Sequence, residues 1–198
     1  MAGAKERERF LQVLSMPVYV ALLRGINLGG RNPIKMAELA VAFETLGFNQ
    51  VKTYIQSGNV VFKANKAAPT TLSKKIEGKI LAEFGLKVSV LTKTAAELKR
   101  AIENNPFVKE RGIDLTGLHV TFLSAPPGES GLNKVKGWRA EPDRFSSCGC
   151  EIYLHCPEGY GTSKLSNAAL EKALEVRATT RNWRTVNRLY EMALECGQ

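Results

Sequence analysis

Histidine, which often supplies acid–base and metal-binding groups in proteins, is scarce in this sequence. The chain has only two histidines, His119 and His155, among 198 residues, and both fall in segments expected to be strands. Neither has a serine or cysteine in a recognisable nucleophile–base arrangement, and no metal-binding motif is present. The sequence therefore predicts no metal site and no cofactor, and it leaves open whether the protein is an enzyme.

Cysteine is also infrequent, and its spacing does not match a zinc site. The four cysteines are Cys148, Cys150, Cys156 and Cys196. Cys148 and Cys150 alternate along a segment expected to be a strand, which predicts small buried apolar side chains. His155 would point to the opposite face of that strand, which argues against a shared metal site. Because no export signal is present, we expect all four thiols to be free.

Long apolar runs are absent as well. The longest candidate, residues 18–23, has the length of a strand, whereas a helix needs roughly 20 apolar residues to span a bilayer. Residues 1–15 are of mixed charge and lack the apolar core and cleavage site of a signal peptide. We interpret them as a flexible extension and expect the protein to be cytoplasmic.

Acidic residues are too few to balance the basic ones. The chain has 19 Asp and Glu against 28 Lys and Arg, which gives a net charge of +9. Such a charge is compatible with non-specific nucleic-acid binding, although the basic residues are spread along the chain rather than clustered. An RNA-recognition module has the topology inferred below, and Tyr19 fits its first motif. Its other motif requires aromatic residues where this chain has Asn59 and Val61, so we reject that module.

Periodicity in the first half predicts a ferredoxin-like βαββαβ lobe over residues 16–93. Strands are expected at residues 18–24, 51–56, 59–63 and 86–91, and helices at residues 33–46 and 69–84. Asn32 and Pro33 are typical of a helix start. Both faces of the first strand are apolar, so we expect both to be covered.

The second half, residues 94–198, repeats this order loosely and predicts a second α+β lobe packed against the first. A helix is expected over residues 94–104, where Thr94 and Glu97 form a capping box. Further strands are expected at residues 118–123, 144–147, 150–155 and 177–180, and helices at 132–138, 164–174 and 183–194. A divergent tandem repeat is our hypothesis for this pattern.

One polar cluster follows from the expected topology of the first lobe. The loop after the first strand and the turn between the second and third strands meet at one end of the sheet. This arrangement gathers Arg24, Asn27, Gln56, Ser57 and Asn59, which could bind an anion through guanidinium, amide and glycine backbone donors. The loop lacks the Walker and dinucleotide fingerprints. The alternative is structural: the same side chains would cap turns and bind backbone carbonyls.

A second polar cluster lies near the end of the chain. It comprises Ser163, Lys164, Thr180, Arg181 and Asn182, at segments that precede or open helices. Helix capping is the structural alternative for the serine and the asparagine.

Several long segments of the sequence are distinctive. They are Ala-Leu-Leu-Arg-Gly-Ile-Asn-Leu-Gly-Gly at 21–30, Thr-Tyr-Ile-Gln-Ser-Gly-Asn-Val-Val-Phe at 53–62, Asn-Pro-Phe at 105–107, Ser-Lys-Leu-Ser-Asn at 163–167 and Ala-Thr-Thr-Arg-Asn-Trp at 178–183. These segments resemble the bacterial family called domain of unknown function 1697. The resemblance implies a two-lobed α+β fold with ferredoxin-like character, and it implies no activity or cofactor.

These observations lead to one functional hypothesis and two alternatives. We expect a binding protein with a pocket between the two lobes for a phosphorylated small molecule or nucleotide. Non-specific nucleic-acid binding through basic surface, and an enzyme of unidentified chemistry, are the alternatives.

Overall fold

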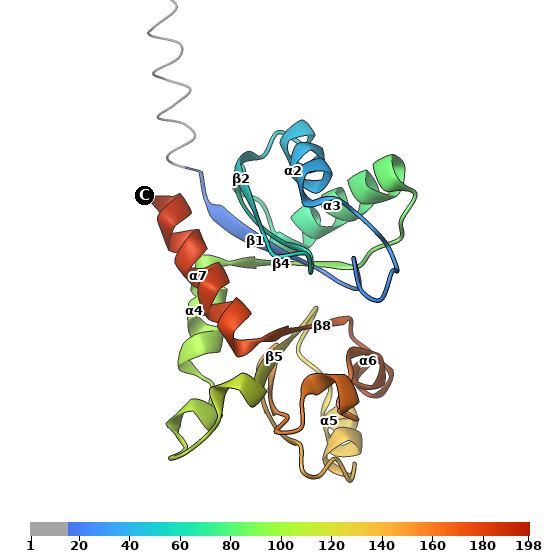
Figure 1. The fold of residues 1–198 in the computed structure, drawn as a ribbon, viewed down its shortest axis with the longest axis vertical. Helices are drawn as coiled ribbons and strands as arrows, with labels where there is room; N and C mark the ends of the chain where they lie inside the picture. Colours follow the sequence, from blue (N-terminus) through green and yellow to red (C-terminus); the bar gives the residue numbers. More distant parts are fainter. Residues whose placement is uncertain (1–15) are drawn as a thin grey trace, which may run out of the picture. The chain divides into compact units, whose positions relative to one another are not determined.

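The computed structural model describes residues 16–198, so the expected extension at residues 1–15 lies outside the described residues. The chain divides into two compact units (Figure 1). The first unit contains the chain up to Leu98 together with Leu189–Gln198, and the second unit contains Lys99–Arg188. No helix within residues 16–198 is long and apolar enough to span a membrane.

The first unit contains the predicted βαββαβ sandwich. Its sheet has the order β2-β3-β1-β4, in which β1 pairs antiparallel with both β3 and β4. The elements are β1 (Val18–Leu23), α2 (Met36–Thr45), β2 (Asn49–Tyr54), β3 (Asn59–Lys63), α3 (Pro69–Phe84) and β4 (Val90–Thr94).

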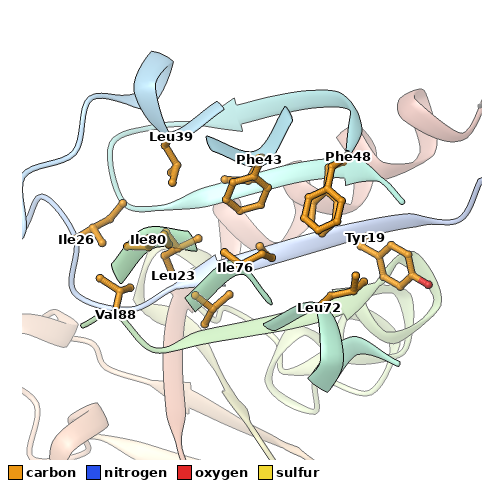
Figure 2. Packing of buried hydrophobic residues seen from close by; sticks show 14 of the residues in the cluster. Tyr19, Leu23, Ile26, Leu39, Phe43, Phe48, Leu72, Ile76, Ile80 and Val88 are labelled. Carbon is orange, nitrogen blue, oxygen red and sulfur yellow. The ribbon is translucent and has the colours of Figure 1, made fainter. Parts of the chain in front are cut away.

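An aromatic core lies between this sheet and helices α2 and α3. Tyr19 and Leu23 point from β1 toward the helices, as Figure 2 shows for the labelled side chains. Phe62 of β3 is fully buried, and its ring lies 4.5 Å from that of Phe48 and 5.4 Å from that of Phe43, centroid to centroid. Because Phe62 contacts residues from several elements, we expect it to contribute most to the stability of this core.

The opposite face of β1 is also covered, as its apolar sequence predicted. Val20 and Leu22 are fully buried, although they alternate with the residues that face α2 and α3. The end of the chain packs near this face, because Gly197 lies against Val18 and Cys196 bonds with Gln50 of β2.

The second unit has the same order of strands and helices as the first. Its sheet order, β6-β7-β5-β8, corresponds strand by strand to that of the first unit. The elements that follow β4 are α4 (Ala95–Glu103), β5 (Leu118–Leu123), α5 (Glu129–Lys136), β6 (Arg144–Cys148), β7 (Glu151–His155), α6 (Asn167–Leu174), β8 (Ala178–Asn182) and α7 (Trp183–Gly197), with short 3-10 turns at Phe107–Lys109, Leu115–Gly117 and Tyr160–Thr162.

Matching hydrogen bonds support the tandem-repeat hypothesis. In the first unit the backbone N–H of Val90 donates to Glu77 Oε1 at 2.8 Å. In the second unit the N–H of Ala178 donates to Glu171 Oε1 at 2.8 Å. Each carboxylate thus fixes the start of the last strand to the second helix of its unit. The two units therefore fasten corresponding elements in the same way.

Two sequence-based expectations about local structure are wrong. Helix α2 begins at Met36 with no side-chain cap, and Asn32 instead donates from Nδ2 to the carbonyl of Gly25 at 3.0 Å. Cys148 is exposed rather than buried. It ends β6, and Cys150 lies in the turn before β7, so the two cysteines do not share one strand. The capping box of Thr94 and Glu97 is confirmed by three hydrogen bonds between them.

Candidate functional site

The loop after β1 is fastened to the β2–β3 turn by the side chain of Asn27. Its Nδ2 donates to the carbonyl oxygens of Ile34 at 2.9 Å and Gln56 at 3.0 Å. Its Oδ1 accepts the backbone N–H of Ile34 at 2.8 Å. Both polar atoms of the Asn27 amide are therefore engaged in hydrogen bonds within the protein. These bonds hold the loop and the turn in one geometry.

The β2–β3 turn is held in its conformation by the buried side chain of Asn59 and by Gly58. Asn59 is fully buried, and its Nδ2 donates to the carbonyl of Tyr54 at 3.2 Å and to Ser57 Oγ at 3.0 Å. Gly58 has φ +77°, and a Cβ on it would lie 2.8 Å from Leu23 Cβ and 2.8 Å from Ile26 Cγ1. Only glycine therefore fits where the turn meets the end of β1.

The outward groups of this region are basic or neutral. Arg31, Gln56 and Ser57 are exposed, and Arg24 is half-buried with its backbone N–H bonded to Ser89 at 2.9 Å. No Asp or Glu occurs at residues 16–37 or 45–76. The structure therefore brings the five predicted residues of this cluster together, with Asn27 and Asn59 as the frame.

Sequence reasoning missed two apolar side chains here. Leu28 is 71% exposed at the tip of the loop, and Ile55 is 49% exposed in the turn. Ile55 also has φ +47°, a left-handed conformation that β-branched residues rarely adopt. Strain of this kind, without burial to compensate it, is typical of functional sites. Nothing in the local sequence signals this conformation.

The second predicted cluster is divided by the sheet. Thr180 and Arg181 are consecutive in β8, so their side chains point to opposite faces. Arg181 is 8% exposed, and its Nη1 donates to Thr179 Oγ1 at 3.0 Å and to the carbonyl of Thr180 at 2.9 Å. Burial lowers the pKa of Arg181 to about 10. This guanidinium is mainly a structural group.

The other predicted residues of that cluster also have structural partners. Asn182 accepts the N–H of Thr185 at 2.8 Å and so caps α7. Ser163 accepts the N–H of Leu165 at 3.0 Å. Lys164 Nζ donates to the carbonyl of Arg139 at 3.0 Å. Helix capping is therefore confirmed for Asn182, whereas Ser163 lies in a turn before α6, whose cap is Ser166.

Thr180 instead belongs to a network that the sequence did not reveal. Its Oγ1 bonds with the side chains of Thr121, Tyr160 and Asn167, and His119 stacks on Tyr160. The strand alternation of β5 and β8 could have placed Thr121 and Thr180 together, but it could not have placed Tyr160.

The first polar cluster lies in the first unit, and the second polar cluster lies in the second unit. Among residues 16–198, no group of three His, Cys, Asp or Glu side chains could hold a metal ion. The four cysteines are free thiols.

Comparison with known proteins gives a family and a fold. A family model described as "Protein of unknown function (DUF1697)" matches residues 16–153. No curated protein matches the chain. The chain is similar to a solved structure described as "The structure of conserved bacterial protein SP0830 from Streptococcus pneumoniae", with 23% identity and a TM-score of 0.67. The likeness covers 90% of this chain and 99% of the other.

Proposed function

The chain belongs to the family of proteins of unknown function DUF1697, and we propose that its first unit binds a small phosphorylated, nucleotide-like anion. The binding region is the loop at residues 24–35 together with the β2–β3 turn at residues 55–59. We call this region the loop–turn site.

The rigid frame around Asn27 carries the proposal. Two hydrogen bonds of the Asn27 side chain join it to Ile34 of the same loop, and a third joins the loop to Gln56 of the turn. A preorganised site binds a ligand without the entropic cost of ordering two flexible segments. The glycines Gly29 and Gly30 leave the loop backbone exposed, so that its N–H groups can approach an anion closely.

Charge favours an anionic ligand at the loop–turn site. Arg31 supplies an exposed forked donor suited to phosphate, and Arg24 lies at the base of the loop. The nearest following carboxylate, Glu38, is paired with Lys35 at 3.2 Å on the exposed start of α2. Neither segment contains a carboxylate, although the Glu77 carboxylate binds the N–H of Val90, which pairs with Leu23 at the end of β1.

Exposed apolar side chains favour an organic anion over inorganic phosphate. Leu28 and Ile55 come from the two segments that Asn27 joins, and both are largely exposed. Burying them against a sugar or base would add about 25 cal/mol per Å² of apolar surface. A ligand with both a phosphate and a flat apolar part uses the whole region.

Calorimetric titration with AMP, ATP, adenosine and inorganic phosphate tests this function. We expect the nucleotides to bind more tightly than adenosine or phosphate. Arg31→Gln should lower the affinity for the nucleotides at least about tenfold, which corresponds to ~1.4 kcal/mol of binding free energy. Lys74→Gln, which removes an exposed charge from α3 of the same unit, is the matched control. Absence of nucleotide binding, or equal losses in both variants, would reject the proposal.

Oligonucleotide titrations of the same two variants test the alternative function, non-specific nucleic-acid binding through basic surface. Equal effects of Arg31→Gln and Lys74→Gln, with affinity that falls steeply as salt increases, would indicate a diffuse basic surface instead.

A further inference from the structure

Thr180 of the second unit is the centre of a hydroxyl network on the helix-covered face of its sheet. Its Oγ1 donates to Asn167 Oδ1 at 2.8 Å and accepts the Tyr160 hydroxyl at 3.0 Å. Thr121 Oγ1 lies 2.7 Å from the same atom. Because a hydroxyl has one proton, and Thr180 gives it to Asn167, Thr121 must donate to Thr180. Thr180 is thereby saturated, and the orientation of the whole network is determined.

His119 adds a ring-nitrogen acceptor to this network. Its ring stacks on that of Tyr160, with centroids 5.1 Å apart and planes 26° apart. Its Nδ1 lies 3.1 Å from the carbonyl oxygen of Gly117. A carbonyl oxygen only accepts, so Nδ1 carries the proton and Nε2 presents a lone pair. Burial lowers the pKa of His119, which keeps the ring neutral near pH 7.

Asn167 supplies the complementary donor. Because its Oδ1 accepts from Thr180, its Nδ2 retains two N–H groups that the network does not use. His119, Tyr160 and Asn167 are each half-buried, so part of each side chain is exposed to solvent. None of the side chains in the network carries a charge near neutral pH.

The fold does not require polar side chains at the positions of His119 and Thr121. Strand register gives His119 and Thr121 the places that Tyr19 and Ala21 occupy in the first unit. The first unit forms the same sheet with an aromatic and an alanine at these positions. The polar character of His119 and Thr121 is therefore not explained by folding alone.

We propose that His119, Tyr160 and Asn167 form a binding site for a small, uncharged, planar ligand with an N–H donor beside a carbonyl acceptor, as in the lactam edge of a nucleobase. The His119 Nε2 accepts the ligand N–H, the Asn167 Nδ2 donates to the ligand carbonyl, and the aromatic pair provides a flat surface. The site belongs to the second unit and is independent of the loop–turn site.

Nitrogen-15 NMR of the imidazole rings tests this site directly. The chain has only two histidines, so His155→Gln identifies the signals of His119. The free protein should show the Nδ1-protonated tautomer of His119. Uracil and hypoxanthine should shift its Nε2 signal, whereas 1,3-dimethyluracil, which has no N–H, should not.

Variants taken from the first unit provide the matched controls. Asn167→Ser introduces the residue that stands at the equivalent place, Ser73, and should weaken the uracil response at least tenfold. Tyr160→Phe keeps the ring and removes the hydroxyl, and amide spectra verify that each variant is folded. Lack of a response to both nucleobases at millimolar concentration, an equal response to dimethyluracil, or the other tautomer in the free protein would overturn the proposal.

Discussion

The two units share one topology, yet they fill matching positions with different chemistry. In the first unit Tyr19 faces α2 and α3 beside Phe62, and their rings lie 5.9 Å apart. In the second unit the matching pair is His119 and Leu154. The βαββαβ topology therefore forms with either a tyrosine or a histidine at this position, so the topology alone does not determine which residue is present.

Some interactions are the same in both units, and these indicate what the fold needs. Ser73 Oγ donates to Thr92 Oγ1 at 3.0 Å in the first unit. Asn167 and Thr180 form the equivalent helix-to-strand bond in the second. In both units this bond joins the second helix to the last strand. In the second unit the Tyr160 hydroxyl also bonds to Thr180, so the single bond becomes part of a network.

The largest expected effect comes from removing the aromatic centre of the first unit. Phe62 is fully buried and contacts three other aromatic rings, so Phe62→Ala should lower the free energy of unfolding by ~3–5 kcal/mol. Urea denaturation followed by far-UV circular dichroism measures the loss. Phe62→Leu, which introduces the side chain found at Leu154, should cost clearly less.

Fluorescence sharpens the same experiment, because both tryptophans of the chain lie in the second unit. Trp138 therefore reports on that unit, whereas Trp183 begins α7, whose end belongs to the first unit. If the Phe62→Ala variant loses circular dichroism signal at lower urea than it loses the tryptophan signal, the damage is confined to the first unit. A loss under about 1 kcal/mol would contradict the central role of Phe62.

An intermediate effect, equal in both units, is expected from the matching carboxylates. Glu77→Ala removes the acceptor of the Val90 N–H, and Glu171→Ala removes that of the Ala178 N–H. Each leaves a strand N–H without its partner, which should cost ~1–3 kcal/mol in unfolding experiments. The glutamine variants keep an acceptor oxygen and should cost less. A cost in only one unit would show that the Glu77 and Glu171 hydrogen bonds do not contribute equally to the stability of their units.

The fold was predictable from sequence because its signals are periodic and local. The alternation around Val20 and the helical spacing near Ile76 indicated strand and helix correctly. Asn32 was misread because an asparagine before a proline resembles a helix cap, whereas it here binds the carbonyl of Gly25. Local patterns cannot distinguish a cap from a loop clamp, since both use the same side-chain chemistry.

The candidate sites were only partly predictable, because they depend on contacts between distant segments. Topology correctly brought Asn27 and Gln56 together, since antiparallel neighbours share an end of the sheet. The strained conformation of Ile55 has no local sequence signal. The network around Thr180 requires Tyr160, whose position depends on how a loop folds over the sheet rather than on periodicity.

The smallest expected effect concerns the ionisation of His119, the residue that most distinguishes the two units. Burial lowers its pKa below 6.5, and the hydrogen bond with the Gly117 carbonyl opposes this shift without reversing it. The unfolded chain therefore binds the proton more readily than the folded protein. Stability should be complete above pH about 6.5 and should decline as the pH falls from there toward the folded pKa.

Urea denaturation between pH about 5.5 and 7.5 isolates this contribution, because most carboxylates stay ionised in that range. The slope attributable to one proton cannot exceed about 1.4 kcal/mol per pH unit. His119→Tyr, which introduces the counterpart from the first unit, should flatten the profile, whereas His155→Gln should leave the decline in place. A profile that is flat in the wild type, or that rises as the pH falls, would mean that His119 is not held in its neutral form.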